Sequence, residues 1–214
     1  MLASLLAAAI PMLAAGAADL DAKLERSLPG WTVDSKAEGD LDGDGVSDVA
    51  AILVKNAGGA KSDPVLAVWF GAADGSVRLI ARAPKATCIG CGGVKAPMDE
   101  PLGALSIANG VLSLASTGGS REEWSSTYKF RWSAKARRLL LIGETRDTVD
   151  TLGEEPEESL DVNFSTRQAI RTVGKKPRRC AVPATFVAPS LDTFDFESFD
   201  DGVIVDACSA KSTP

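Results

Sequence analysis

The segment WSSTYKFRW at residues 124–132 restricts the possible folds of this chain more than any other stretch. Its aromatic residues share one face of an extended chain, and its charged residues share the other. Alternation with a period of two predicts a strand with one buried and one solvated face, as in antiparallel sheets. A row of aromatic rings can also stack on sugars, but alternation with polar residues favours a core face. The residues expected to point inward are Trp124, Tyr128, Phe130 and Trp132.

Further strand signals surround this segment. Short apolar runs at residues 49–54 and 65–70 are typical of buried strands. Asn109-Gly110 lies between two alternating runs and predicts a tight hairpin. Residues 19–28 form a short amphipathic helix candidate with leucines four positions apart. The expected fold is therefore mainly β: a single antiparallel β-rich domain, built as a meander, a sandwich or a propeller-like sheet, with a short N-terminal helix.

The two ends of the chain differ from its middle. Residues 1–18 carry no charge and end in small side chains, which is typical of a secretory signal peptide; a short buried helix is the alternative. Residues 19–173 are expected to form the β-rich domain and residues 174–214 a C-terminal extension. Three phenylalanines at 194, 196 and 199 predict that this extension packs against the main sheet. No later segment is long enough to span a membrane. Because of the predicted signal peptide, we expect a periplasmic or secreted protein.

Charge and residue usage exclude several functions. The net charge of −6 argues against a nucleic-acid partner, because phosphate binding needs a clustered positive surface. The chain has no histidine, which excludes Ser-His-Asp and Cys-His catalysis and the zinc sites with histidine ligands. Any acid–base chemistry would depend on carboxylates, lysines or Tyr128, the single tyrosine.

The four cysteines predict disulfides, since even numbers are typical of exported proteins. The expected pairs are Cys88–Cys91 in a glycine-rich loop and Cys180–Cys208 near the C-terminus. A redox pair at Cys88-Ile89-Gly90-Cys91 is the alternative, but no helical pattern follows it. A four-cysteine zinc site is disfavoured by the wide spacing of the second pair.

Residues 39–54, GDLDGDGVSDVAAILV, combine four aspartates, a central glycine and an apolar run. Alternate carboxylates can converge on one point if the backbone curls, and Gly45 permits the sharp turn. Six to eight oxygen ligands of this kind suit Ca²⁺ better than zinc or magnesium. The predicted ligands are the side chains of Asp40, Asp42, Asp44 and Asp48 and the backbone carbonyl of Val46.

An EF-hand is excluded because the position of its bidentate glutamate is Ala51. The D-x-D-x-D-G-x-x-D pattern before a strand instead resembles the calcium loops of FG-GAP and VCBS-type repeats, in a single copy of about fifteen residues. That resemblance implies the same five ligands. The wider pattern, with CGG, GGSREEWSSTYKFRW and LIG segments, resembles a group of uncharacterised secreted bacterial proteins, which implies a bacterial, periplasmic setting.

We expect a non-catalytic, calcium-binding interaction module whose partner is a protein or a glycan. One alternative is a glycan hydrolase that uses paired carboxylates, with Glu122, Glu123 and Asp99 as candidates. Another is a periplasmic enzyme inhibitor that acts through the segment Ser116–Trp124, although an ordinary hairpin connection is the favoured interpretation of that segment.

Overall fold

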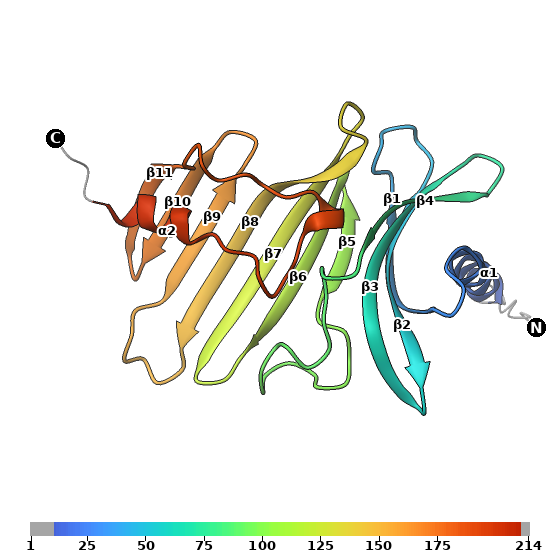
Figure 1. Ribbon diagram of the computed structural model, residues 1–214, viewed down its shortest axis with the longest axis horizontal. Coiled ribbons are helices and arrows are strands. Elements are labelled where there is room, and N and C mark those ends of the chain that lie inside the picture. Colours follow the sequence, from blue (N-terminus) through green and yellow to red (C-terminus); the bar gives the residue numbers. More distant parts are fainter. Residues whose placement is uncertain (1–10, 211–214) are drawn as a thin grey trace, which may run out of the picture.

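The computed structural model describes residues 11–210 and consists mainly of two antiparallel sheets (Figure 1). Neighbouring strands in each sheet are consecutive in the chain, so both sheets are meanders, and the predicted antiparallel β fold is confirmed. The four-stranded sheet contains β1 (Thr32–Gly39), β2 (Asp48–Ala57), β3 (Ala60–Gly71) and β4 (Val77–Ala83). The seven-stranded sheet contains β5 (Ala104–Ala108), β6 (Val111–Gly119), β7 (Glu122–Ser133), β8 (Arg138–Asp150), β9 (Glu158–Asn163), β10 (Gln168–Val173) and β11 (Lys176–Ala181).

Helix α1 (Pro11–Ser27) covers the outer face of the four-stranded sheet. Leu24 is fully buried against that sheet, and the indole nitrogen of Trp69 donates a hydrogen bond of 2.7 Å to the Ser27 hydroxyl. The helix begins before the predicted range of 19–28, inside the predicted signal peptide, whose first ten residues lie outside the described residues. In residues 11–210, no helix is both long and apolar enough to cross a bilayer.

A single core joins the inner faces of the two sheets. Ile52 and Phe70 from the four-stranded sheet belong to the same buried cluster as Leu114 and Phe130 from the seven-stranded sheet. The edge strands β1 and β5 meet so closely that a Cβ on Gly39 would lie 2.7 Å from Cγ2 of Ile107. A glycine is therefore needed where the sheets join, and the aspartate-rich loop begins at this junction.

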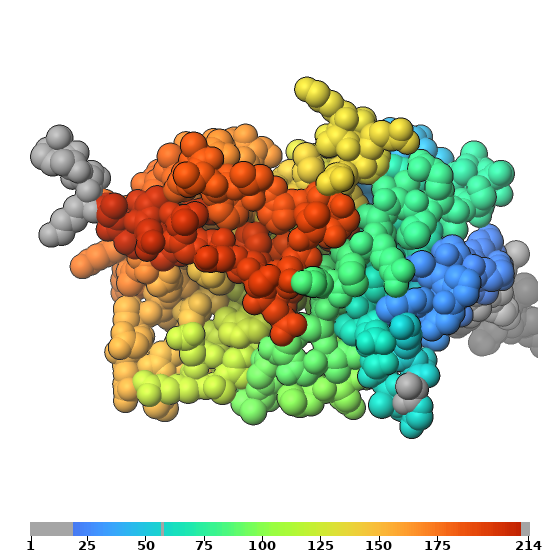
Figure 2. Space-filling view, in the orientation of Figure 1, coloured from blue at the N-terminus to red at the C-terminus, as the bar shows by residue number. Residues whose placement is uncertain are grey.

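The C-terminal extension crosses the inner face of the seven-stranded sheet and then returns across it (Figure 1). It forms η1 (Leu191–Thr193) and runs back to α2 (Gly202–Ser209), and it shows as an orange-red band over the left and centre of the molecule in Figure 2. The ring centroids of Phe194, Phe199 and Phe196 lie 4.7, 5.3 and 6.2 Å from that of Tyr128. The predicted packing of these phenylalanines against the main sheet is confirmed, and the contact is made on Tyr128 of β7.

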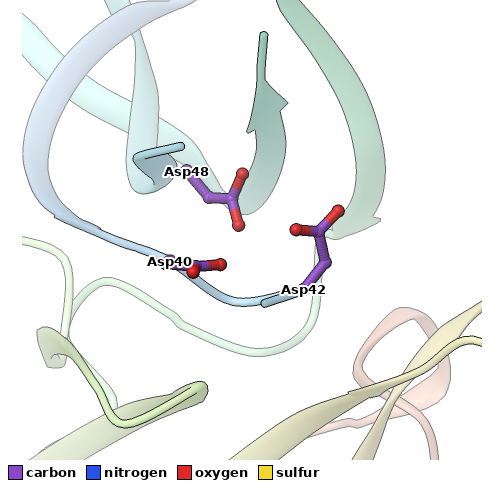
Figure 3. A group of neighbouring side chains, drawn as sticks. All are labelled: Asp40, Asp42 and Asp48. Carbon is purple, nitrogen blue, oxygen red and sulfur yellow. The ribbon is translucent and has the colours of Figure 1, made fainter. Parts of the chain in front are cut away.

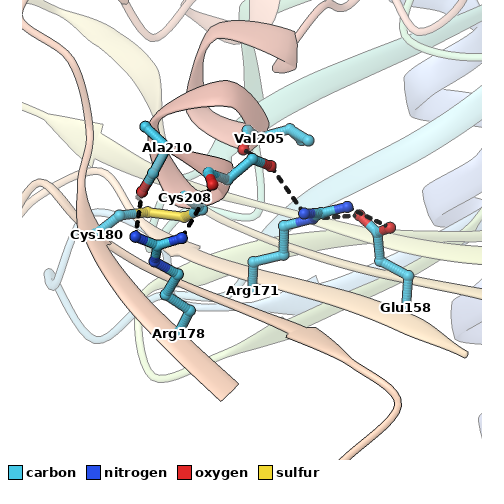
Figure 4. The surroundings of a disulfide bond; sticks show 8 residues. Glu158, Arg171, Arg178, Cys180, Val205, Cys208 and Ala210 are labelled. Atoms are coloured by element: carbon cyan, nitrogen blue, oxygen red, sulfur yellow. Dashed lines mark hydrogen bonds and ion pairs between the residues drawn. A yellow bond between two sulfur atoms is a disulfide. The ribbon is translucent and has the colours of Figure 1, made fainter. Parts of the chain in front are cut away.

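Both predicted disulfides are present. Cys88–Cys91 closes a turn in the loop between β4 and β5, and no helix follows it. Cys180–Cys208 ties α2 to the edge strand β11 (Figure 4). Arg171 and Arg178 reinforce this attachment by donating hydrogen bonds of 2.8 and 3.0 Å to the hydroxyl and carbonyl oxygens of Ser209.

Candidate metal centre

The aspartate-rich loop connects the end of β1 to the start of β2, at the junction of the two sheets. Gly43 and Gly45 adopt φ angles of +85° and +82°, a left-handed conformation that side chains disfavour. The turn predicted at Gly45 is therefore present, and Gly43 provides a second one. These two glycines fold the loop back so that its carboxylates face one another.

Three carboxylates converge in this loop (Figure 3). Asp40, Asp42 and Asp48 each offer an oxygen, and these oxygens lie within 4.8 Å of one another. Asp48 is fully buried, Asp40 is half-buried and Asp42 is exposed. The group is therefore anchored in the protein at Asp48 and open to solvent at Asp42. Such an oxygen-only group can hold a metal ion.

Asp48 also fastens the loop to the sheet. Its two carboxylate oxygens accept hydrogen bonds from the backbone N–H groups of Leu41 (2.7 Å) and Gly71 (3.0 Å). Burial raises the pKa of Asp48, and these hydrogen bonds oppose that effect. Gly71 must be a glycine, because a Cβ there would lie 2.2 Å from the carbonyl oxygen of Ser47.

Asp40 holds the turn itself. Its oxygens accept hydrogen bonds from the backbone N–H groups of Gly43 (2.7 Å) and Gly45 (2.9 Å). Asp44 is placed differently: it is exposed, accepts a hydrogen bond of 2.7 Å from the Val46 N–H, and lies outside the group of three. The structure thus brings together three of the four predicted carboxylates, and Val46 lies two residues after Asp44 in the turn.

A second acidic group was not apparent from the sequence. Glu144 on β8 and Asp201 before α2 are 1% and 4% exposed, and they lie close together between the sheet and the C-terminal extension. Arg146 donates a hydrogen bond of 3.0 Å to Oδ1 of Asp201. Both oxygens of Glu144 and Oδ2 of Asp201 have no hydrogen-bond partner in the described part of the chain.

A β-bulge turns Glu144 inward. The β7–β8 register runs from Phe130↔Leu141 to Lys129↔Gly143, so Ile142 is an extra residue. Strict alternation from the buried Leu141 would have placed Glu144 on the outer face, but one inserted residue reverses the faces. In the sequence, this bulge is indicated only by Gly143, a glycine within the strand directly after Ile142.

Two carboxylates share one arginine in this second group. Burial first, and then the Asp201 carboxylate, raise the pKa of Glu144 to about 8, although Arg146 opposes them. At neutral pH Glu144 is therefore protonated and can donate to the free oxygen of Asp201. Burial also raises the pKa of Tyr128 far above its usual range, so its hydroxyl stays protonated as well.

The other candidate residues are scattered. Glu122 lies beside Trp124 and Arg146 in an open hollow of about 640 Å³, whereas Glu123 points to the opposite face and pairs with Lys95 at 2.8 Å. Asp99 is exposed in the loop before β5. The segment Ser116–Trp124 forms the ends of β6 and β7 with a tight connection, as in an ordinary hairpin. The arrangement gives no paired carboxylates among the three hydrolase candidates.

Comparisons with known proteins add no relative: no family model, no curated protein and no solved structure matches this chain. The FG-GAP-like and secreted-family resemblances therefore stay predictions.

Proposed function

We propose that the loop Asp40–Asp48 binds one Ca²⁺ ion and that the ion stabilises an exported, non-catalytic interaction module. The observation that carries this proposal is the convergence of oxygens from Asp40, Asp42 and Asp48 within 4.8 Å. All the candidate ligands are oxygens, which favours a hard cation, and Ca²⁺ tolerates irregular geometry and water ligands better than Mg²⁺ does.

Calcium has a structural role in this proposal. Asp48 links the loop to the end of β3 through Gly71, and the loop begins beside the contact between β1 and β5. An ion that binds only the folded loop stabilises the whole domain by mass action. The two disulfides support a location outside the cytoplasm, where calcium-binding modules have dissociation constants of about 10⁻⁴–10⁻³ M.

Thermal melting in calcium and in chelator tests the proposal. Asp42 is the variant position of choice, because it is exposed and, within residues 11–210, its carboxylate accepts a hydrogen bond from the Asp44 N–H alone, at 3.2 Å. Asp42→Asn should remove most of the rise in Tm that calcium gives the natural protein and should leave Tm in chelator unchanged. Asp74→Asn, in the exposed β3–β4 turn, is the control and should keep the full rise. Equal calcium responses of Asp42→Asn and the natural protein would contradict the proposal.

A further inference from the structure

Two hollows lie side by side along the aspartate-rich loop. One, of about 720 Å³, separates the loop from the Asn109-Gly110 turn and includes Arg131. The other, of about 360 Å³, lies between the loop and the start of β4 and includes Arg78 and Arg137. Both are lined by Asp42, Trp132 and Ala134, so they are neighbours, and together they are referred to below as the loop groove.

Three arginines that have no carboxylate partner among the described residues line the loop groove. In residues 11–210, Arg78, Arg131 and Arg137 form no ion pair with a carboxylate. Some arginines elsewhere, such as Arg121 and Arg171, pair with acids at 3.1 and 2.7 Å, whereas others, such as Arg179, form no ion pair within residues 11–210. The Arg78 guanidinium lies over the Phe70 ring, 5.7 Å from its centroid. In a chain of net charge −6, three arginines without a carboxylate partner around one groove favour an anionic ligand.

Arg137 is also held in a strained conformation. Its φ angle is +53°, and its N–H donates a hydrogen bond of 2.7 Å to the Ser133 carbonyl in the turn between β7 and β8. Glycine or asparagine adopts this conformation at lower cost, and strained residues are concentrated at binding sites. The position therefore carries an arginine where the backbone alone would favour glycine.

Trp132 gives the loop groove a flat apolar wall. It is only partly buried, and it contacts Phe70 edge-to-face at a centroid distance of 4.9 Å. A sugar ring can stack on an indole of this kind. Arginine side chains bind carboxylates, and an aromatic ring beside them can stack on a sugar ring. This combination suits a sugar that carries a carboxylate.

We propose that the loop groove binds an acidic oligosaccharide, with a uronate carboxylate held by the arginines and a sugar ring on Trp132. This inference rests on the proposed calcium site. Three aspartates supply fewer oxygens than the six to eight that Ca²⁺ takes, and the group is open at Asp42, which lines the groove. Sugar hydroxyls or a carboxylate can supply the missing ligands.

Calcium and the saccharide should therefore strengthen each other's binding. Without the ion, the charges of Asp40 and Asp42 repel an acidic ligand from the same groove. With the ion, that repulsion is removed. Because coupling between two binding sites is reciprocal, the saccharide should raise calcium affinity by the same factor.

Calorimetric titration of the full chain with a β-linked glucuronic acid tetrasaccharide tests this inference. A glucose tetrasaccharide of the same linkage and tetraglutamate are the comparison ligands. Of these three ligands, we expect only the acidic saccharide to bind. Its affinity should be about tenfold higher in calcium than in chelator. Arg137→Gly should weaken it about tenfold while Tm is unchanged or higher, because glycine relieves the positive φ angle. Arg179→Gln, on the exposed edge strand β11, is the matched control and should bind normally.

Separate calcium titration of the same samples distinguishes the two proposals. Calcium binding without saccharide binding would overturn this inference and leave the calcium site intact. Equal saccharide affinity in calcium and in chelator would overturn the coupling between calcium binding and saccharide binding. Equal binding of glucose tetrasaccharide or tetraglutamate, or an equal loss in Arg179→Gln, would overturn the assignment to an acidic saccharide.

Discussion

The aspartates of the β1–β2 loop and the pair Glu144–Asp201 are both groups of close carboxylates, but their surroundings are opposite. In the loop, backbone N–H groups donate to Asp40 and Asp48, and the exposed side at Asp42 can admit a cation. At the buried pair, three carboxylate oxygens lack a hydrogen-bond donor within residues 11–210, and Arg146 supplies a positive charge by donating to Asp201. We infer from this comparison that the accessible group is suited to neutralisation by a bound cation, whereas a proton neutralises the buried pair.

The largest expected effect comes from removing the arginine at the buried pair. Arg146→Met leaves Glu144 and Asp201 without a positive partner, and we expect unfolding free energy at pH 7 to fall by about 3 kcal/mol. Urea unfolding measures this loss. Arg179→Met is the control, since Arg179 is exposed on β11 and should change stability by less than about 0.5 kcal/mol. Equal losses in the two variants would show that the buried pair does not depend on its arginine.

The pH dependence of the unfolding free energy should reveal whether Glu144 is protonated in the folded state. Its pKa rises from an ordinary value of 4.5 to about 8, so between these values the folded state binds a proton that the unfolded state releases. The contribution of Glu144 to the unfolding free energy is therefore fully present below pH 4.5. It is lost as pH rises towards 8, with a slope of up to about 1.4 kcal/mol per pH unit.

Glu144→Gln isolates that contribution. Glutamine cannot titrate and its amide can still donate to Asp201, so the variant should lose the downward slope between pH 5 and 8 and be more stable than the natural protein above pH 8. Unfolding in chelator over this range measures the slope without a contribution from calcium. Parallel profiles of the two proteins would refute a shared proton at this pair.

A smaller difference in stability is expected between variants of Asp48, which anchors the loop, and of Asp42, which lies on its open side. Asp48→Asn replaces an oxygen by an amide that faces a backbone N–H, so it should cost about 1–2 kcal/mol even in chelator. Asp42→Asn should cost almost nothing there. Chemical unfolding in chelator compares the two variants, and equal stabilities would mean that Asp48 does not anchor the loop.

The sequence predicted most of the fold because its signals are local. Alternation in residues 124–132 and the Asn109-Gly110 turn depend on neighbouring residues alone, and the turn lies between β5 and β6 as expected. The cysteine pairs were also predicted, since four cysteines allow few pairings. These features need no knowledge of distant contacts.

The buried pair could not be predicted because it depends on two non-local events. Ile142 forms a bulge against β7, which reverses the face of Glu144, and the returning extension then brings Asp201 from 57 positions further along the chain. Spacing alone also could not show that Asp44 turns to the Val46 N–H instead of joining the other three aspartates. Ligand spacing predicted the loop, whereas hydrogen bonding decides which carboxylates converge.

The most direct test of calcium binding at the loop is calorimetric titration of the full chain with Ca²⁺ at pH 7. We predict one ion per chain, with a dissociation constant of about 10⁻⁴–10⁻³ M, and loss of this binding in Asp42→Asn. The absence of binding heat in the natural protein, or an unchanged affinity in Asp42→Asn, would contradict a calcium site at Asp40, Asp42 and Asp48.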